Sequence, residues 1–392
     1  MKKYITILLS AVFVGIFTNV GHPVTPYYIN EIALPKIVFG YLYAAMSLGM
    51  LISAPIWGSI GDSKGRKWVL IVCSIFYGVG QTLFGIFKNP VLIIFARLFS
   101  GLFSGGILVS LLSYISRSKD LLRFNTTRTT ALFISLQLVG VSIGQFVGGA
   151  LGNVFNPHYE YVLYAQGIMM LLFALYVLIF MDFSDEEKIG IRSANPFASF
   201  KSLKVLTLEL VFFFIIIALV NITFTDVSKY LDVYFSDCGY ESLKLGTVNL
   251  VVGILTLLVN LFLTPILIKK IKPLPSLFIF SLFGGIMLIL TFVLPNLLLN
   301  IYTFYMLFIA AKAIIEPVIV EYLNQHKDIA SGVLMGLRQS FISLGGIIGV
   351  IIGGHIYAYN NVLIFYVCAG ILIFSGIACL IIQIFNKNKI NN

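Results

Sequence analysis

The amino-acid sequence predicts an all-α integral membrane protein with twelve transmembrane helices arranged in two six-helix bundles. Of its 392 residues, 59% are hydrophobic and 11% are charged, a composition too apolar for a soluble domain of this length. The apolar residues fall in runs of about 20, the length that crosses a hydrocarbon core of roughly 30 Å. These runs predict spans at 4–28, 37–59, 68–87, 90–115, 129–154, 161–181, 205–230, 245–268, 275–294, 298–322, 331–358 and 361–385.

The positive charges predict how the chain is oriented in the membrane. The net charge is +10, and most Lys and Arg residues lie at the two ends or in the loops that follow spans 2, 4, 6, 8 and 10. Because positively charged loops stay on the cytoplasmic side during insertion, we expect a plasma-membrane protein with both termini in the cytoplasm. This distribution describes topology in a lipid bilayer and excludes a nucleic-acid partner.

The longest break in hydrophobicity lies near the middle of the chain and predicts a cytoplasmic linker. It divides the chain into an N-terminal bundle at 1–182, a linker at 183–204 and a C-terminal bundle at 205–392. A repeat supports this division, because the glycines of span 5 recur in span 11 at a constant offset of 205 residues. Those of span 5 are Gly140, Gly144, Gly148 and Gly149, and those of span 11 are Gly345, Gly349, Gly353 and Gly354. Parallel halves of this kind place a substrate site between them near the middle of the membrane.

A short, charged and glycine-rich turn joins spans 2 and 3. It contains Gly58, Asp62, Gly65, Arg66 and Lys67, and its positive charge predicts a cytoplasmic location. The spacing G-x3-D-x2-G-R-K closely resembles the signature between helices 2 and 3 of the major facilitator superfamily. The resemblance implies the major facilitator fold and a conformational latch in which Asp62 and Arg66 hold the cytoplasmic side in one state.

Spans 4 and 5 carry a second resemblance, to the drug:proton antiporter branch of that superfamily. Arg97 begins the segment RLFSGLFSGG in span 4, and the resemblance implies a role in proton coupling. A guanidinium at this depth either faces the bundle interior or extends to the outer surface. Small residues at every fourth position of span 5 predict close helix packing. In the branch a proline follows the second glycine of span 5, where this chain has Gln145.

Other polar residues in the spans are candidates for coupling and substrate binding. Lys312 and Glu316 are four residues apart in span 10, which predicts either a functional ion pair or a self-neutralising structural bridge. We expect Glu316 and Asp226 to take part in proton coupling together with Arg97. The candidate substrate-binding residues are Asn19, His22, Gln137, Asn221 and Lys312. His22 titrates near neutrality if it is wet, but a hydrogen-bonded structural histidine is an equal alternative.

No pattern in the sequence indicates an enzyme. The four histidines and four cysteines show no metal-ligand spacing, and no nucleotide-binding loop is present, so we expect no metal and no cofactor. The expected partners are a small-molecule substrate, protons and the lipid bilayer, for a protein that acts as a monomer. We therefore predict a proton-coupled exporter of small lipophilic or amphipathic compounds that works by alternating access. The alternative is a facilitator that imports or exports one metabolite, such as a sugar, an amino acid or a lipid precursor.

Overall fold

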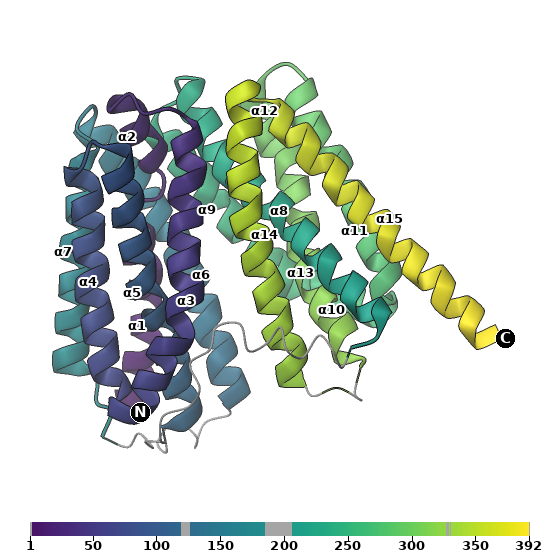
Figure 1. Cartoon of the computed structure of the whole chain (residues 1–392), viewed down its shortest axis with the longest axis horizontal. Helices are drawn as coiled ribbons and strands as arrows, with labels where there is room; N and C mark the ends of the chain where they lie inside the picture. Colours follow the sequence, from purple (N-terminus) through teal and green to yellow (C-terminus); the bar gives the residue numbers. More distant parts are fainter. Residues whose placement is uncertain (1, 119–125, 185–205, 327–328, 330, 392) are drawn as a thin grey trace. The chain divides into compact units, whose positions relative to one another are not determined.

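The structure is a computed structural model that describes residues 2–118, 126–184, 206–326, 329 and 331–391 (Figure 1). In this part of the chain, 11 helices are long and apolar enough to cross a membrane, and a shorter apolar helix covers Lys3–Asn19. The predicted all-α membrane fold is therefore confirmed. The predicted linker at 183–204 lies almost entirely outside the described residues.

The first predicted span, 4–28, is wrong as one continuous helix. The structure has two helices, α1 (Lys2–Asn19) and α2 (Thr25–Glu31). The break contains Gly21 and Pro23. Proline disfavours a helical conformation at the residue before it and removes a backbone donor, so the chain leaves the helix here. Pro26 stands in the first turn of α2, where its missing N–H costs nothing.

Five long helices follow, and their ends have local causes. Gly65 separates α3 from α4 with a φ of 106°, a conformation that glycine adopts without a steric penalty. Asn89 caps α5, where its side chain accepts hydrogen bonds from the backbone of Val91 at 2.9 Å and Leu92 at 3.4 Å. The helices are α3 (Ile37–Lys64), α4 (Arg66–Ile86), α5 (Pro90–Arg117), α6 (Thr126–Phe155) and α7 (Glu160–Phe180).

Two of the remaining predicted spans contain π-helical segments. The span at 245–268 is made of α9, η2 and α10, and the π turn lies just before Pro265. A proline ring clashes with the carbonyl four residues earlier in an α-helix, and the wider π turn accommodates it. The elements of this part are α8 (Leu208–Asp237), α9 (Ser242–Leu258), η2 (Val259–Leu263), α10 (Thr264–Lys270), α11 (Pro273–Val293), α12 (Leu297–Asn300), η3 (Ile301–Tyr305), α13 (Met306–Asn324), α14 (Ser331–Tyr359) and α15 (Leu363–Asn391).

The chain forms two compact units, which do not follow the sequence order completely. Unit 1 comprises residues 1–196 and 235–253, and unit 2 comprises residues 197–234 and 254–392. The end of α8 and the first part of α9 thus pack with unit 1. There the Tyr27 hydroxyl donates to the Tyr240 carbonyl at 2.8 Å, and the Ser242 hydroxyl donates to the Gly149 carbonyl at 2.9 Å. The division into six plus six helices stays a prediction from the sequence.

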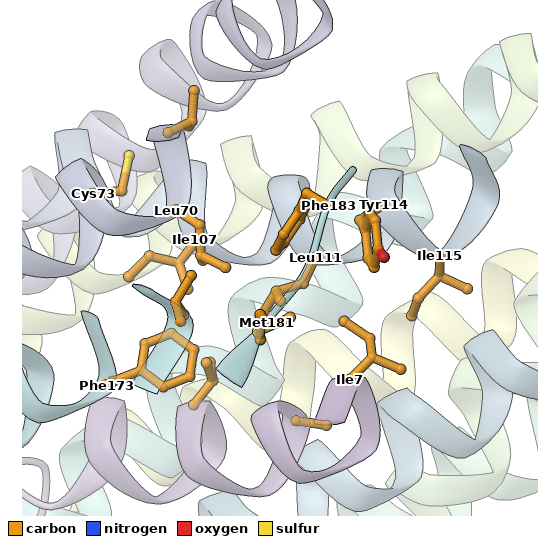
Figure 2. Close-up of a cluster of buried hydrophobic side chains, with 14 of the residues drawn as sticks. Ile7, Leu70, Cys73, Ile107, Leu111, Tyr114, Ile115, Phe173, Met181 and Phe183 are labelled. Carbon is orange, nitrogen blue, oxygen red and sulfur yellow. The ribbon is translucent and has the colours of Figure 1, made fainter. Parts of the chain in front are cut away.

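The helices of unit 1 enclose a continuous apolar core. Helix α1 packs against α6, α5 packs against both α3 and α4, and α4 packs against α7 (Figure 1). Side chains from α1, α4, α5, α6 and α7 meet in a buried cluster, part of which is drawn in Figure 2. In that view Phe183 lies beside Tyr114, with ring centroids 4.1 Å apart. The core therefore continues past the end of α7 into the chain that follows it.

Polar contacts fasten the same end of the unit. The Tyr114 hydroxyl donates to the Asp182 carbonyl at 2.7 Å, and the Lys3 ammonium lies 3.2 Å from the Asp182 carboxylate. Hydrogen bonds from the backbone N–H and the hydroxyl of Ser184, followed by the charge of Lys3, hold the pKa of Asp182 below its usual value. The start of α1 is thereby joined to the end of α7.

Candidate transport and coupling site

The charged turn between α3 and α4 forms a buried ion pair. Arg66 donates to the carboxylate of Asp62, and both side chains are nearly inaccessible to solvent. Gly65 lies between the two helices. Lys67 points elsewhere and donates to the Leu178 carbonyl of α7 at 3.0 Å. The charges of Asp62 and Arg66, both noted in the sequence, thus pair with each other at this turn. Gly58 is less constrained, since an added Cβ would meet only Val109, at 3.4 Å.

Arg97 of α5 faces the interior of unit 1 and does not extend to a surface. It is 8% exposed, and its guanidinium donates to the Gln81 side chain at 3.1 Å and to the Thr25 hydroxyl at 2.9 Å. The same group lies 3.8 Å from the centre of the Phe84 ring, a cation–π contact. Neutral groups from α2 and α4 therefore hold this buried cation.

The candidate substrate-binding residues of unit 1 lie on three elements. Asn19, at the end of α1, donates to the Gly15 carbonyl of its own helix at 3.0 Å. In the break after α1, His22 Nε2 lies 3.3 Å from the Tyr43 hydroxyl of α3. Gln137 on α6 is half-buried, and its backbone carbonyl lies against Gly15. Asn19 and the backbone of Gln137 thus both lie against Gly15, whereas the contact of His22 is with α3.

The glycines of α6 form a packing face. An added Cβ at Gly140 or Gly144 would overlap the backbone of α1, and one at Gly148 would overlap the backbone of Val20, just after α1 ends. Gly149 faces the other way, toward Ser242 and Gly246 on the part of α9 that belongs to unit 1. Backbones approach this closely only where small residues allow it. These four glycines thus lie at close contacts with neighbouring segments, and their role as a packing motif stays a prediction.

In unit 2 the glycines of α14 pack on α8 and enclose an acid. Gly345 lies against Ala218, while Gly349 and Gly353 lie against the two carboxylate oxygens of Asp226. Asp226 is 3% exposed. Its Oδ1 atom has no hydrogen-bond partner in the part of the chain that the structure describes. A carboxyl group in such a place is costly when ionised and unpaired.

A cavity of about 220 Å³ lies in unit 2 among α8, α13 and α14. Its polar groups are Asn221, Glu316, Arg338 and Gln339, and Phe224 contributes to its apolar wall. Glu316 and Arg338 lie close enough for their charges to interact. The cavity therefore offers an acid, a guanidinium and two amides beside hydrocarbon. Its remaining wall is formed by Ile217, Val220, Ile319 and Ile342.

The residues around the cavity correct the expected Lys312–Glu316 ion pair and add Arg338 and Gln339 to the candidate site. Among the described residues no ion pair joins Lys312 to Glu316, although their spacing predicted one. The Lys312 ammonium instead lies 5.3 Å from the centre of the Phe224 ring. The sequence analysis did not single out Arg338 and Gln339, because they are not part of a recognisable motif. An Arg-Gln pair inside an otherwise apolar run was the signal available, because charges within spans normally face the interior of a bundle.

Membrane-spanning helices, buried charges inside each unit and a mixed polar and apolar cavity define a membrane transporter. A model of the Major Facilitator Superfamily matches residues 7–327, and the chain belongs to this family. The protein is therefore a multi-pass membrane transporter and not an enzyme.

Individual relatives agree with the family. The chain is 24% identical to "Multidrug resistance protein 2" of Bacillus subtilis (strain 168), covering 92% of this chain and 90% of that one. It is 22% identical to "Quinolone resistance protein NorA" of Staphylococcus aureus, covering 100% and 99%. The crystal structure of the nucleoside transporter NupG matches with a TM-score of 0.74 at 11% identity, covering 98% and 99%. That of the human organic anion transporter MFSD10 matches with a TM-score of 0.66 at 13% identity, covering 96% and 99%.

Proposed function

We propose that this transporter is a proton-coupled exporter of small lipophilic or amphipathic compounds that works by alternating access. The observation that carries the proposal is the cavity of unit 2, where Glu316 and Arg338 lie with two amides beside apolar side chains. Such a lining suits a compound with both hydrocarbon and polar groups. The names of the multidrug and quinolone resistance relatives support the same activity. We propose a monomer in the plasma membrane with both termini in the cytoplasm.

In the proposed cycle Glu316 exchanges the proton. A carboxylate is stabilised in its ionised form by a nearby cation and takes up a proton when that cation is withdrawn. Arg338 supplies the cation in the described structure, a role that the sequence had suggested for Lys312. When a polar group of the substrate engages Arg338, Glu316 accepts a proton from the outer side. Lys312 and Asn221 contact the substrate, and Asp226 is the second candidate for proton uptake.

The residues of unit 1 support this cycle indirectly. Arg97 holds Thr25 and Gln81 in place, and we propose that its charge contributes to coupling without leaving the unit. The Asp62–Arg66 pair fixes the α3–α4 turn, which we propose as the latch of one transport state. Asn19, His22 and Gln137 stay predictions as substrate contacts.

The variant Glu316→Gln tests the coupling in proteoliposomes. The assay follows a fluorescent amphipathic dye with an anionic group that Arg338 can engage, such as 1-anilinonaphthalene-8-sulfonate, with and without an imposed pH gradient. We expect Glu316→Gln to bind the dye and to exchange it between the two sides, but to lose pH-driven uphill transport. Glu321→Gln is the matched control, because Glu321 lies on the same helix and does not line the cavity.

Two results would contradict the proposal in different ways. Full pH-driven transport by Glu316→Gln would remove Glu316 from the coupling, and Asp226→Asn would then be measured in the same assay. If the wild-type protein moves no dye with any gradient but carries one metabolite, the facilitator alternative is correct.

A further inference from the structure

Three side chains of the types that bind metal ions lie close together within unit 1. Glu31 is the last residue of α2, His158 lies in the connection between α6 and α7, and Glu160 is the first residue of α7. One potential ligand atom from each lies within 4.8 Å of the other two. Spacing along the sequence gave no indication of this Glu31–His158–Glu160 cluster, because Glu31 is more than 100 residues away from the other two along the chain.

The spacing of the imidazole and the carboxylate suits two ligands of one ion better than a direct hydrogen bond. His158 Nδ1 and Glu160 Oε1 are 3.5 Å apart, whereas a direct hydrogen bond is normally about 2.7–3.2 Å long. A tetrahedral zinc ion with bonds of about 2.0–2.2 Å to nitrogen and oxygen separates its ligand atoms by about 3.4 Å. The observed separation therefore needs little adjustment to place both atoms on one ion.

The other oxygen of Glu160 gives a second, independent indication. Glu160 Oε2 is shielded from solvent and has no hydrogen-bond partner among the described residues. A shielded carboxylate oxygen without a donor is unfavourable, and a cation would supply the missing partner. The His158 side chain is 59% exposed, which leaves a path by which an ion can enter.

We propose that Glu31, His158 and Glu160 bind a divalent cation of the zinc class. Two carboxylate oxygens and one imidazole nitrogen form a ligand set typical of zinc sites in which a fourth position holds water. Such an ion connects the end of α2 to the start of α7. It thereby stabilises unit 1 where the break after α1 leaves α2 as a short, separate helix. This site does not depend on the proposed transport activity.

The proposal is tested by zinc titration of the purified full-length protein, with its affinity tag removed. Isothermal titration calorimetry with ZnCl₂ is performed in a Cys238→Ser background, because Cys238 is an exposed thiol. We expect one saturable site that His158→Asn, Glu160→Gln and Glu31→Gln each weaken by more than about tenfold, since even the outer partners of metal ligands contribute 10–100-fold. His326→Asn and Glu241→Gln are the matched controls and are expected to bind as the parent does.

Other outcomes would overturn the proposal. These are no saturable zinc binding, equal binding by all variants, or a site that prefers CaCl₂ and survives His158→Asn, which would be a carboxylate cluster only. Size-exclusion profiles and metal-free melting curves check that each variant is folded. Cobalt gives a second readout, because tetrahedral Co²⁺ absorbs strongly in the visible range. This absorption is expected in the parent and is expected to disappear in His158→Asn and in the more conservative His158→Gln.

Discussion

The two units pack corresponding pairs of helices, α1 with α6 and α8 with α14, in different ways. Glycines of α6 lie on α1, and glycines of α14, 205 residues later, lie on α8. In unit 1 the glycines that face α1 and the break after it meet backbone atoms and the Pro23 ring. In unit 2 the same face makes room for the carboxylate of Asp226. At the position 205 residues before Asp226 the chain has Gly21, in the break after α1.

The difference shows that a small-residue face can serve two purposes. In α6 it allows the closest approach of two backbones, and α1 ends soon afterwards, at Asn19. In α14 it encloses an acid, and α8 continues unbroken to Asp237. A repeated packing geometry has therefore acquired a buried ionisable group in one copy only. This asymmetry places the coupling candidate Asp226 in unit 2, the unit that also contains Glu316.

The largest expected effect comes from filling the α6 face. In Gly148→Leu the new side chain would overlap the Val20 carbonyl in the break after α1, and a backbone atom cannot move aside as a flexible side chain can. We expect a loss of more than about 3 kcal/mol of stability and little folded protein in detergent. Gly370→Leu on α15 is the control, since an added Cβ there meets nothing within 4 Å. Wild-type melting of Gly148→Leu would show that the face is incidental.

A smaller effect is expected in the turn between the second and third spans, where the units also differ. Unit 1 has the buried Asp62–Arg66 pair, whereas the residues 205 positions later are Leu267 and Ile271. Removing one charge of a buried pair costs roughly 3 kcal/mol or more, and the amide of Asp62→Asn can still accept a hydrogen bond. We expect a loss of about 3 kcal/mol at most and the loss of transport.

Asp182→Asn provides the contrast for that measurement. The Asp182 side chain is 58% exposed in its pair with Lys3, and exposed pairs contribute about 0–1 kcal/mol. Melting temperatures of the two variants are compared in the same detergent. Equal shifts would mean that burial of the Asp62–Arg66 pair has no energetic consequence.

The sequence predicted the features that depend on local pattern. Run lengths predicted the spans, and glycine spacing predicted close packing along α6 and a repeat of its glycines in α14. The features that it missed depend on contacts between distant segments. The spacing of Lys312 and Glu316 placed them on one helical face. It could not show that the Lys312 ammonium lies over the Phe224 ring, or that Arg338 lies near Glu316, because these partners come from other helices. The predicted span at 4–28 was wrong as one helix, because Gly21 and Pro23 break the helix inside a run that is otherwise apolar.

A substitution on the α14 face, with a smaller expected effect than that of Asp62→Asn, distinguishes the two purposes of a glycine face most directly. An added Cβ in Gly349→Ala would lie 2.9 Å from Asp226 Oδ1 and 3.2 Å from Ile222 Cα, whereas in Gly346→Ala it would lie 3.7 Å from Thr225 Oγ1. We expect Gly349→Ala to cost about 1–2 kcal/mol of stability, in the range of modest overpacking, and Gly346→Ala to leave the melting temperature unchanged.

If Gly349 is small because it makes room for Asp226, then truncating the Asp226 side chain should relieve the strain. In an Asp226→Ala background, Gly349→Ala should therefore cost at least about 0.5 kcal/mol less, a coupling that a double-mutant cycle measures. Strictly additive effects would mean that Gly349 serves the approach of the backbone near Ile222, and that α14 packs on α8 for the same reason that α6 packs on α1.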